Sequence, residues 1–322
     1  MLPRFPRQLA PLALVAAACA TDQTNITGPG LALSAADVPA LNAYLVAVNH
    51  ALDANGANYR VARAEYLVAR EPGDPAGQTV FAIEREMRLD SRWVPGDPRR
   101  ATSGNVIRYA HFAPLMWANA GTGTARVNAT PAVEASFRTW DSRTCTTLDL
   151  QRVTLPGTVL PSSMLAVAGF TNNPLLADIN TLGFLPGSIF DAVLGPGAST
   201  NVLGATFTFV WGTNTAAGFE PSDIDEDGRD DTAFKEVWYN DTFAWALSGG
   251  GIDPVDIETV ALHENGHALE LGHFGALFRT DANGKVHSSP RAVMNAAVLG
   301  RLRAPLGTDV AAYCGTFASW PG

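Results

Sequence analysis

Apolar residues recur along the chain with two periods, one typical of helices and one typical of strands. Helical spacing predicts a helix over residues 37–54 and an amphipathic helix over 127–143, whose Val133, Phe137 and Trp140 face the interior. Apolar stretches lie at 61–68 and 80–87. Strands are predicted at 105–111, 148–155, 202–211 and 233–239. Helices and strands mixed in this order predict an α+β fold.

Three further segments complete the expected order of elements. The Gly- and Pro-rich stretch 156–200 holds at least one more short strand. Residues 202–211 alternate in the manner of a strand exposed at the edge of a sheet. A last helix begins near Asp253 and carries the most informative motif of the chain.

The N-terminus resembles an export signal. Arg4 and Arg7 precede an apolar run over residues 9–18, and small residues surround Cys19. Cleavage after Ala20 would release a secreted protein, whereas cleavage before Cys19 would leave a thiol for a lipid anchor. Both outcomes place the protein outside the cytoplasm.

Composition and charge limit the partners. A chain of 322 residues with 47% hydrophobic content is long enough to bury a sizeable core. The net charge of −9 gives no electrostatic reason to expect nucleic acid or an anionic membrane surface. No stretch after the leader is long and apolar enough for a transmembrane span.

The cysteines point to one disulfide bond. In an oxidising compartment the two that remain without Cys19, Cys145 and Cys314, are predicted to pair. A bond that closes so long a loop stabilises by about 3–5 kcal/mol in the chain-entropy model. Two unrelated buried thiols are the alternative.

Residues 263–273 read His-Glu-Asn-Gly-His-Ala-Leu-Glu-Leu-Gly-His and give the last helix the chemistry of a metal site. His263 and His267 are one helical turn apart, so they project from one face toward one ion. His273 reaches the same ion only if the helix ends before it. Glu264 lies one residue round, beside the metal.

Three histidines and one glutamate at these spacings are typical of catalytic zinc. Three neutral imidazoles leave the fourth position of tetrahedral Zn²⁺ open for water. Zinc lowers the pKa of that water, and Glu264 can take its proton as it attacks a carbonyl polarised by the metal. Asp281 and Asp309 are alternative third ligands, and a solvated His and Glu pair without metal is the simpler alternative.

This segment resembles the metzincin superfamily of zinc endopeptidases, whose pattern is His-Glu-x-x-His-x-x-Gly-x-x-His followed by a Met-turn. Met294, within residues 291–295, resembles the methionine of that turn, and Ala296 favours the matrixin-like and reprolysin-like branches. The resemblance implies a catalytic domain at 105–322 with a twisted mixed five-stranded sheet, an active-site helix and a C-terminal subdomain. It also implies a polypeptide substrate added as a strand along residues 202–211.

One position departs from the family pattern. Glu270 stands where the family has a glycine of positive φ, a conformation that is strained by roughly 1 kcal/mol or more in other residues. Either Glu270 adopts the strained conformation or the turn moves to Gly272.

Residues 21–104 are expected to be an N-terminal extension or prodomain, after a signal peptide at 1–20. Removal near Arg99 and Arg100 is one possibility, and an exposed arginine loop within an integral first layer is the other. Many matrixins stay latent through a prodomain cysteine bound to zinc. Since no cysteine lies between Thr21 and Thr144, that form of latency is not expected.

An acidic loop gives the second chemical signal. Within residues 223–231, a glycine and alternating carboxylates resemble a calcium loop of the EF-hand type. Phe234 replaces the bidentate Glu of that motif, so the remaining oxygen ligands must come from Glu236, water or another segment. An acidic solvated loop is the alternative. The expected Ca²⁺ ligands are Asp223, Asp225, Asp227 and Asp231.

These features together predict a secreted, bacterial-type zinc endopeptidase in which Glu264 is the general base, with structural Ca²⁺ beside catalytic Zn²⁺. Two alternatives stay open. One is a calcium-stabilised surface binding protein with a degenerate zinc site, which Glu270 keeps open. The other is a zinc amidohydrolase that acts on a non-protein amide.

Overall fold

The computed structural model describes most of the chain after residue 36. The expected signal peptide with Cys19, and the apolar stretch 80–87, lie outside the described residues. None of the described helices has the length and apolar character that a membrane span requires. The described residues are 37–69, 90–101, 104–168, 174–248, 254–279 and 286–321.

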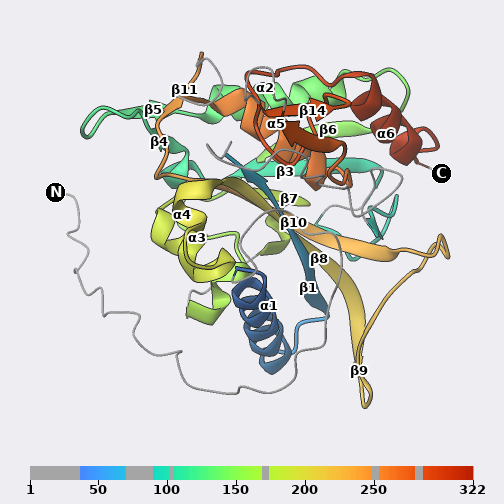
Figure 1. Cartoon of the computed structure of the whole chain (residues 1–322). Helices are drawn as coiled ribbons and strands as arrows, with labels where there is room; N and C mark the ends of the chain where they lie inside the picture. Colours follow the sequence, from blue (N-terminus) through green and yellow to red (C-terminus); the bar gives the residue numbers. More distant parts are fainter. Residues whose placement is uncertain are drawn as a thin grey trace.

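One mixed sheet of eight strands runs through the molecule (Figure 1). Its main path has the order β1-β8-β10-β7-β3-β6; β2 pairs with β10 and β9 pairs with β8. Strands β10, β7, β3 and β6 are parallel to one another, while β8 runs antiparallel to both β10 and β1. The bounds are β1 Tyr59–Val68, β2 Ser91–Arg92, β3 Val106–His111, β6 Asp149–Thr154, β7 Ile179–Leu185, β8 Val202–Thr215, β9 Gly218–Pro221 and β10 Asp230–Asn240.

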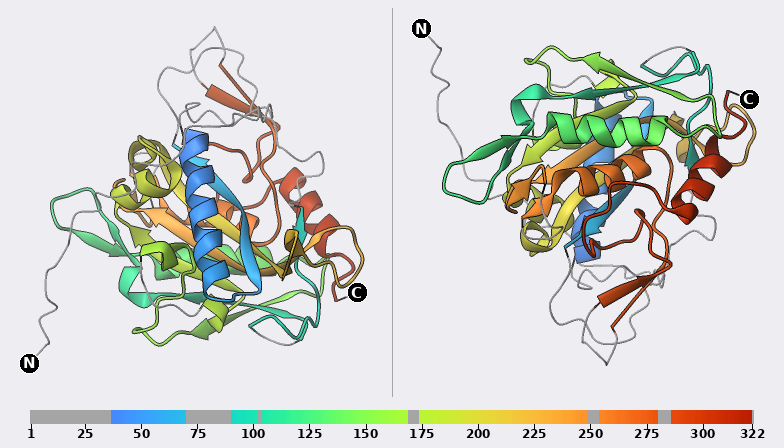
Figure 2. Two further views of the ribbon diagram at one scale, coloured as in Figure 1. Left: turned by 90° about the horizontal axis from the view of Figure 1, so that it is seen from below. Right: turned by 90° about the horizontal axis from the view of Figure 1, so that it is seen from above.

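Helices cover both faces of this sheet, which gives an α+β fold with two hydrophobic cores. Helices α2, α5 and α6 pack on one face, and α1, α3 and α4 pack on the other (Figures 1 and 2). Their bounds are α1 Asp37–Ala54, α2 Thr130–Asp141, α3 Gly187–Leu194, α4 Ala198–Asn201, α5 Ile257–Ala268 and α6 Gly307–Phe317. Short two-stranded pairs are β4 Trp117–Asn119 with β5 Arg126–Asn128, β11 Trp245–Ala246 with β12 Val255–Asp256, and β13 Ala276–Arg279 with β14 Val286–Ser289.

Local periodicity predicted several elements well. Helix α1 has the expected bounds, and α2 buries Val133, Phe137 and Trp140 as its amphipathic pattern indicated. Strand β7 is the short strand expected within residues 156–200. The sheet has more than the five expected strands because β1, β2 and β9 join it.

The prediction of an exposed edge strand at 202–211 is wrong. Strand β8 lies between β1 and β10, and all of these residues are buried. The alternation that suggested a solvent face comes from threonines with buried partners: Thr206 donates to Glu264, and Lys235 donates to Thr208. A polar position within a strand therefore marks either solvent or a buried hydrogen bond, and periodicity alone does not distinguish them.

The expectation of an exposed arginine loop is also wrong. Arg100 is buried, and its guanidinium contacts the Asp178 carboxylate at 3.1 Å and lies over the Trp93 ring. Arg99 is partly buried and pairs with Asp231 at 2.6 Å. This segment is therefore bound to the sheet through ion pairs, although removal of residues 21–104 during maturation stays a prediction.

The predicted disulfide bond between Cys145 and Cys314 is present, with a Cα–Cα distance of 5.6 Å. It joins the loop after α2 to α6 across a sequence separation of 169 residues. In the chain-entropy model, the loss of disorder in so long a loop stabilises the folded state by about 5 kcal/mol.

The buried His111 makes stability depend on pH. Neither ring nitrogen has a hydrogen-bond partner among the described residues, and burial, with a smaller contribution from Arg152, lowers the pKa of His111 from 6.5 to about 3. His111 of the unfolded chain therefore binds a proton below pH 6.5, whereas His111 of the folded chain binds one only below about pH 3. Stability contributed by neutral His111 is lost as pH falls through this window, by at most about 1.4 kcal/mol per pH unit.

We expect His111→Phe to remove this contribution, because phenylalanine fills the site beside Phe137 without titrating. The measurement is the free energy of urea unfolding of parent and variant from about pH 4 to pH 7, without metal. The difference between the two curves should change with pH in this window. A constant difference would mean that His111 does not titrate as its burial implies.

Candidate metal centre

Helix α5 holds the first two histidines rigidly. The Asp256 carboxylate caps its N-terminus by accepting from the Thr259 amide at 3.0 Å, and it also pairs with Arg303. The helix ends at Ala268, whose carbonyl accepts from the Trp93 indole at 3.0 Å. This early end lets the following residues turn back toward the helix.

The three predicted histidines converge on one point. Their Nε2 atoms lie 2.9 Å apart for His263 and His267, 3.1 Å for His267 and His273, and 3.2 Å for His263 and His273. Ligand nitrogens around tetrahedral zinc are separated by about 3.3 Å, given Zn–N bonds of about 2.0–2.1 Å. The triangle of nitrogens therefore has nearly the size that a zinc ion requires.

The second ring nitrogens fix the form of two imidazoles. Nδ1 of His263 contacts the Val293 carbonyl at 2.7 Å, and Nδ1 of His267 contacts the Leu271 carbonyl at 2.7 Å. A carbonyl only accepts, so each Nδ1 carries the proton and each Nε2 presents a lone pair. Lone pairs that point at one another repel, and a cation between them removes that repulsion. The donor set thus fits a metal ion.

Burial keeps these histidines neutral, which is the form that binds metal. All three side chains are buried, and burial lowers the pKa of His263 to about 4. For His267 and His273, burial and then the neighbouring imidazoles lower the pKa well below 6.5. Protons therefore compete weakly with a metal at neutral pH.

Glu264 is fully buried between α5 and β8. Its Oε2 accepts from Thr206 Oγ1 at 2.7 Å, and its Oε1 has no hydrogen-bond partner among the described residues. Gly204 makes room for it, since a Cβ at that position would lie 2.8 Å from Oε1. Burial raises the pKa of Glu264 well above 4.5, against hydrogen bonds from Thr206 and the Leu67 amide that lower it.

Glu270 adopts the strained conformation, with φ of 65°, and so takes the conformation of the family glycine. Its buried carboxylate accepts from Ser91 at 3.0 Å, from Thr232 at 2.6 Å and from Lys235 Nζ at 2.7 Å. These three bonds offset the strain and place His273 beside the helix. Lys235 lies far from Glu270 in sequence, and no local pattern indicates their pairing.

Met294 is buried against the metal helix. A Cβ added at Gly266 would lie 2.4 Å from its sulfur, so the thioether packs closely on α5 between the two helical histidines. Asp309, the alternative ligand, instead accepts from the Val293 and Met294 amides at 2.9 and 3.1 Å. It holds the chain at Met294 and is not a ligand. Asp281 lies outside the described residues.

The acidic loop assembles three of its four predicted ligands. Carboxylate oxygens of Asp223, Asp225 and Asp231 lie within 4.8 Å of one another, whereas Asp227 pairs with Arg92 at 3.3 Å. Glu236 does not contribute, because its carboxylate faces away from the loop and accepts from Ser162 at 2.8 Å. Calcium binding by this loop stays a prediction.

Comparison with known proteins gives no family. No protein-family model and no curated protein matches the chain. Among solved structures it is similar, at 11% identity and a TM-score of 0.28, to a chain of "GM1 bound form of the ECX AB5 holotoxin", covering 77% of this chain and 84% of that one. A likeness this low carries no argument about fold or function.

We expect the Lys235–Glu270 pair to stabilise the centre. Lys235→Met leaves a buried carboxylate without its cation and should lower the free energy of unfolding by about 3–5 kcal/mol. The double variant Lys235→Met with Glu270→Gly should recover much of the loss, because no charge remains unpaired and glycine accepts the positive φ. Urea unfolding without metal measures both variants. If the double variant lost as much free energy of unfolding as the two single variants together, the pairing of Lys235 with Glu270 would be contradicted.

If calcium binds, it should use the three clustered carboxylates. Calcium at about 100 times its Kd would then raise the free energy of unfolding by about 2.7 kcal/mol, and Asp225→Asn should abolish most of this increase. Asp227→Asn is the matched control, since that carboxylate pairs with Arg92. Thermal unfolding with calcium and with chelator gives the comparison. No increase in the parent would mean an acidic loop without an ion.

Proposed function

We propose that this protein is an extracytoplasmic zinc endopeptidase of the metzincin type. The observation that carries the proposal is the convergence of three Nε2 lone pairs on one point, with two of these histidines on the helix that also carries the buried Glu264. Such a donor set suits zinc with one position left for a reacting molecule. A polypeptide rather than a small amide is the substrate that the resemblance of residues 263–273 to the metzincin pattern implies.

Each residue of the centre has a definite task in this proposal. His263, His267 and His273 would hold the metal, and zinc when bound supplies Lewis acidity toward water and the scissile carbonyl. Glu264 takes the proton from the attacking water and delivers it to the leaving nitrogen. Thr206 orients this carboxylate by its hydrogen bond to Oε2.

The binding-protein alternative rested on Glu270, which departs from the family pattern. Its carboxylate is accommodated by Lys235, Ser91 and Thr232, and the three histidines converge despite it. Glu270 therefore gives no reason to regard the zinc site as degenerate. The amidohydrolase alternative gains no support from the arrangement of the described residues.

The first test is metal content. Purified chain without its leader should bind one zinc ion, and His267→Ala should lose it, because two imidazoles remain. His50→Ala, an exposed histidine on α1, is the matched control and should keep the metal. Zinc measured by mass spectrometry after dialysis decides this step. Equal zinc in all three proteins would refute the assignment of the ligands.

The second test is turnover of casein by parent and Glu264→Ala. The variant should keep its zinc and lose about 10²–10⁴-fold in rate, the usual contribution of a general base. Equal rates in the two proteins would mean that Glu264 is not the base. Because β1 occupies the edge of β8 on which a substrate strand would add, the assay must also be run on a variant in which β1 is loosened.

A further inference from the structure

The candidate centre is closed to a polypeptide substrate by the chain itself. Strand β1 lies on the edge of β8 that an added strand would use, and pairs with it antiparallel over nearly its whole length. All three histidines and Glu264 are buried beneath it. A substrate therefore reaches the metal only after β1 has moved.

The end of β1 is hydrogen-bonded on both sides, as an extended chain within a groove would be. On one side Tyr66 and Leu67 pair with β8. On the other side the Val68 amide donates to the Ala296 carbonyl at 3.2 Å, and the Val298 amide donates to the Val68 carbonyl at 3.2 Å. Residues 66–68 thus join β8 to the segment that follows Met294.

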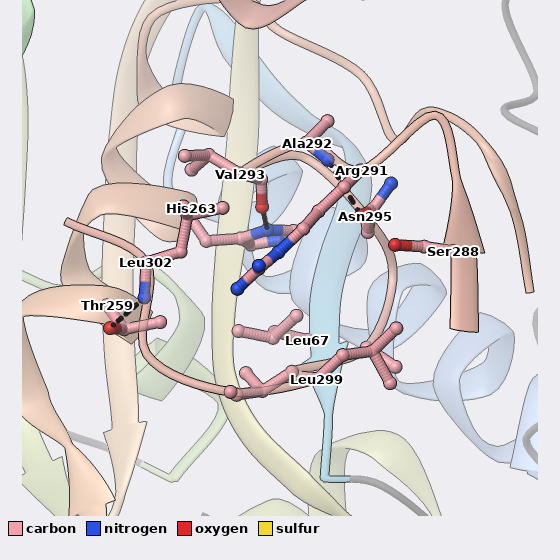
Figure 3. A pocket seen from close by; sticks show the side chains of 13 residues that line it. Leu67, Thr259, His263, Ser288, Arg291, Ala292, Val293, Asn295, Leu299 and Leu302 are labelled. Atoms are coloured by element: carbon pink, nitrogen blue, oxygen red, sulfur yellow. Dashed lines mark hydrogen bonds between the residues drawn. The ribbon is translucent and has the colours of Figure 1, made fainter. Parts of the chain in front are cut away.

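Leu67 lines the pocket beside the histidine cluster. Figure 3 shows its side chain among His263, Val293, Leu299 and Leu302, and only 1% of Leu67 is exposed. These neighbours come from α5 and from residues 293–302, so Leu67 packs between the metal-binding helix and the segment around Met294.

Two further contacts bring β1 to the residues of the centre. Leu67 pairs with Gly204, where a Cβ would lie 2.8 Å from Oε1 of Glu264. Glu65, two residues earlier and on the same face, places Oε2 3.7 Å from Nδ1 of His273. The strand therefore lies against His273 and the adjoining pocket, and it pairs with the part of β8 that faces Glu264.

We propose that residues 65–68 are an internal occupant of the substrate groove, which keeps this chain latent until β1 leaves. The inference rests on the proposed function, because the groove is defined by the zinc centre. It requires no cysteine, since the strand occludes by pairing and by packing of Leu67. Displacement of β1 would expose the edge of β8, the pocket and the metal in one step.

Leu67→Ala tests this proposal, with zinc-loaded full chain lacking only its leader. The variant loses much of the packing that holds β1 in the groove, so β1 should open more often. We expect casein turnover and the rate of zinc withdrawal by a coloured chelator to rise at least about tenfold over the parent. Val68→Pro, which removes the donor to Ala296, should act in the same direction.

Val61→Ala is the matched control. Val61 is buried on the same strand but packs in the core on the α1 side, away from the metal. It should destabilise the fold without emptying the pocket, and leave zinc withdrawal and casein turnover unchanged. Equal acceleration by Val61→Ala would overturn the proposal, because general loosening would then explain the effect.

The two readouts separate this proposal from the proposed function. Zinc withdrawn faster from Leu67→Ala while casein stays uncut would support occlusion and refute the endopeptidase. A parent that cleaves casein as fast as Leu67→Ala would support the endopeptidase and overturn occlusion. If the chelator withdraws zinc from Leu67→Ala and from Val68→Pro no faster than from the parent, occlusion would also be overturned.

Discussion

The buried ion pair between Lys235 and Glu270 is the constraint on which the centre depends. A helix that ends at Ala268 must reverse within a few residues to bring back His273, and the reversal passes through a positive φ at Glu270. Strain alone would favour other conformations. The carboxylate is held by Lys235 and two hydroxyls, and an ion pair broken in the interior is far less favourable than an intact one. Strand β10 thereby fixes the position of His273.

Sequence predicted what is local and missed what is distant. The spacing of His263 and His267 fixes their shared helical face, and the amphipathic pattern fixes the inward face of α2. The partners of charged and polar residues are not local. Lys235 lies within the predicted strand at 233–239, and its charge is stabilised by a carboxylate 35 residues away. Threonines of β8 looked solvent-exposed because their partners lie on other elements.

The same limit explains the acidic loop. Counted along the sequence, its carboxylates repel one another and favour a cation. In space, Arg92 pairs with Asp227, and Arg99 pairs with Asp231. Both arginines come from a segment more than a hundred residues earlier, so part of the charge is already balanced by the chain. The charge balance of the loop therefore depends on distant arginines that its local pattern does not reveal, and calcium binding stays a prediction.

The region before residue 105 performs two opposed tasks, which restricts how the centre could open. Strand β1 packs on the histidine cluster, whereas Ser91 and Trp93 support the cluster: Ser91 donates to Glu270, and the Trp93 indole donates to the end of α5. Loss of everything up to Arg100 would expose the groove and also remove these supports. Loss or displacement of β1 alone would open the groove and leave the turn at Glu270 held. The physical argument therefore favours opening at β1, with residues 90–101 retained on the sheet.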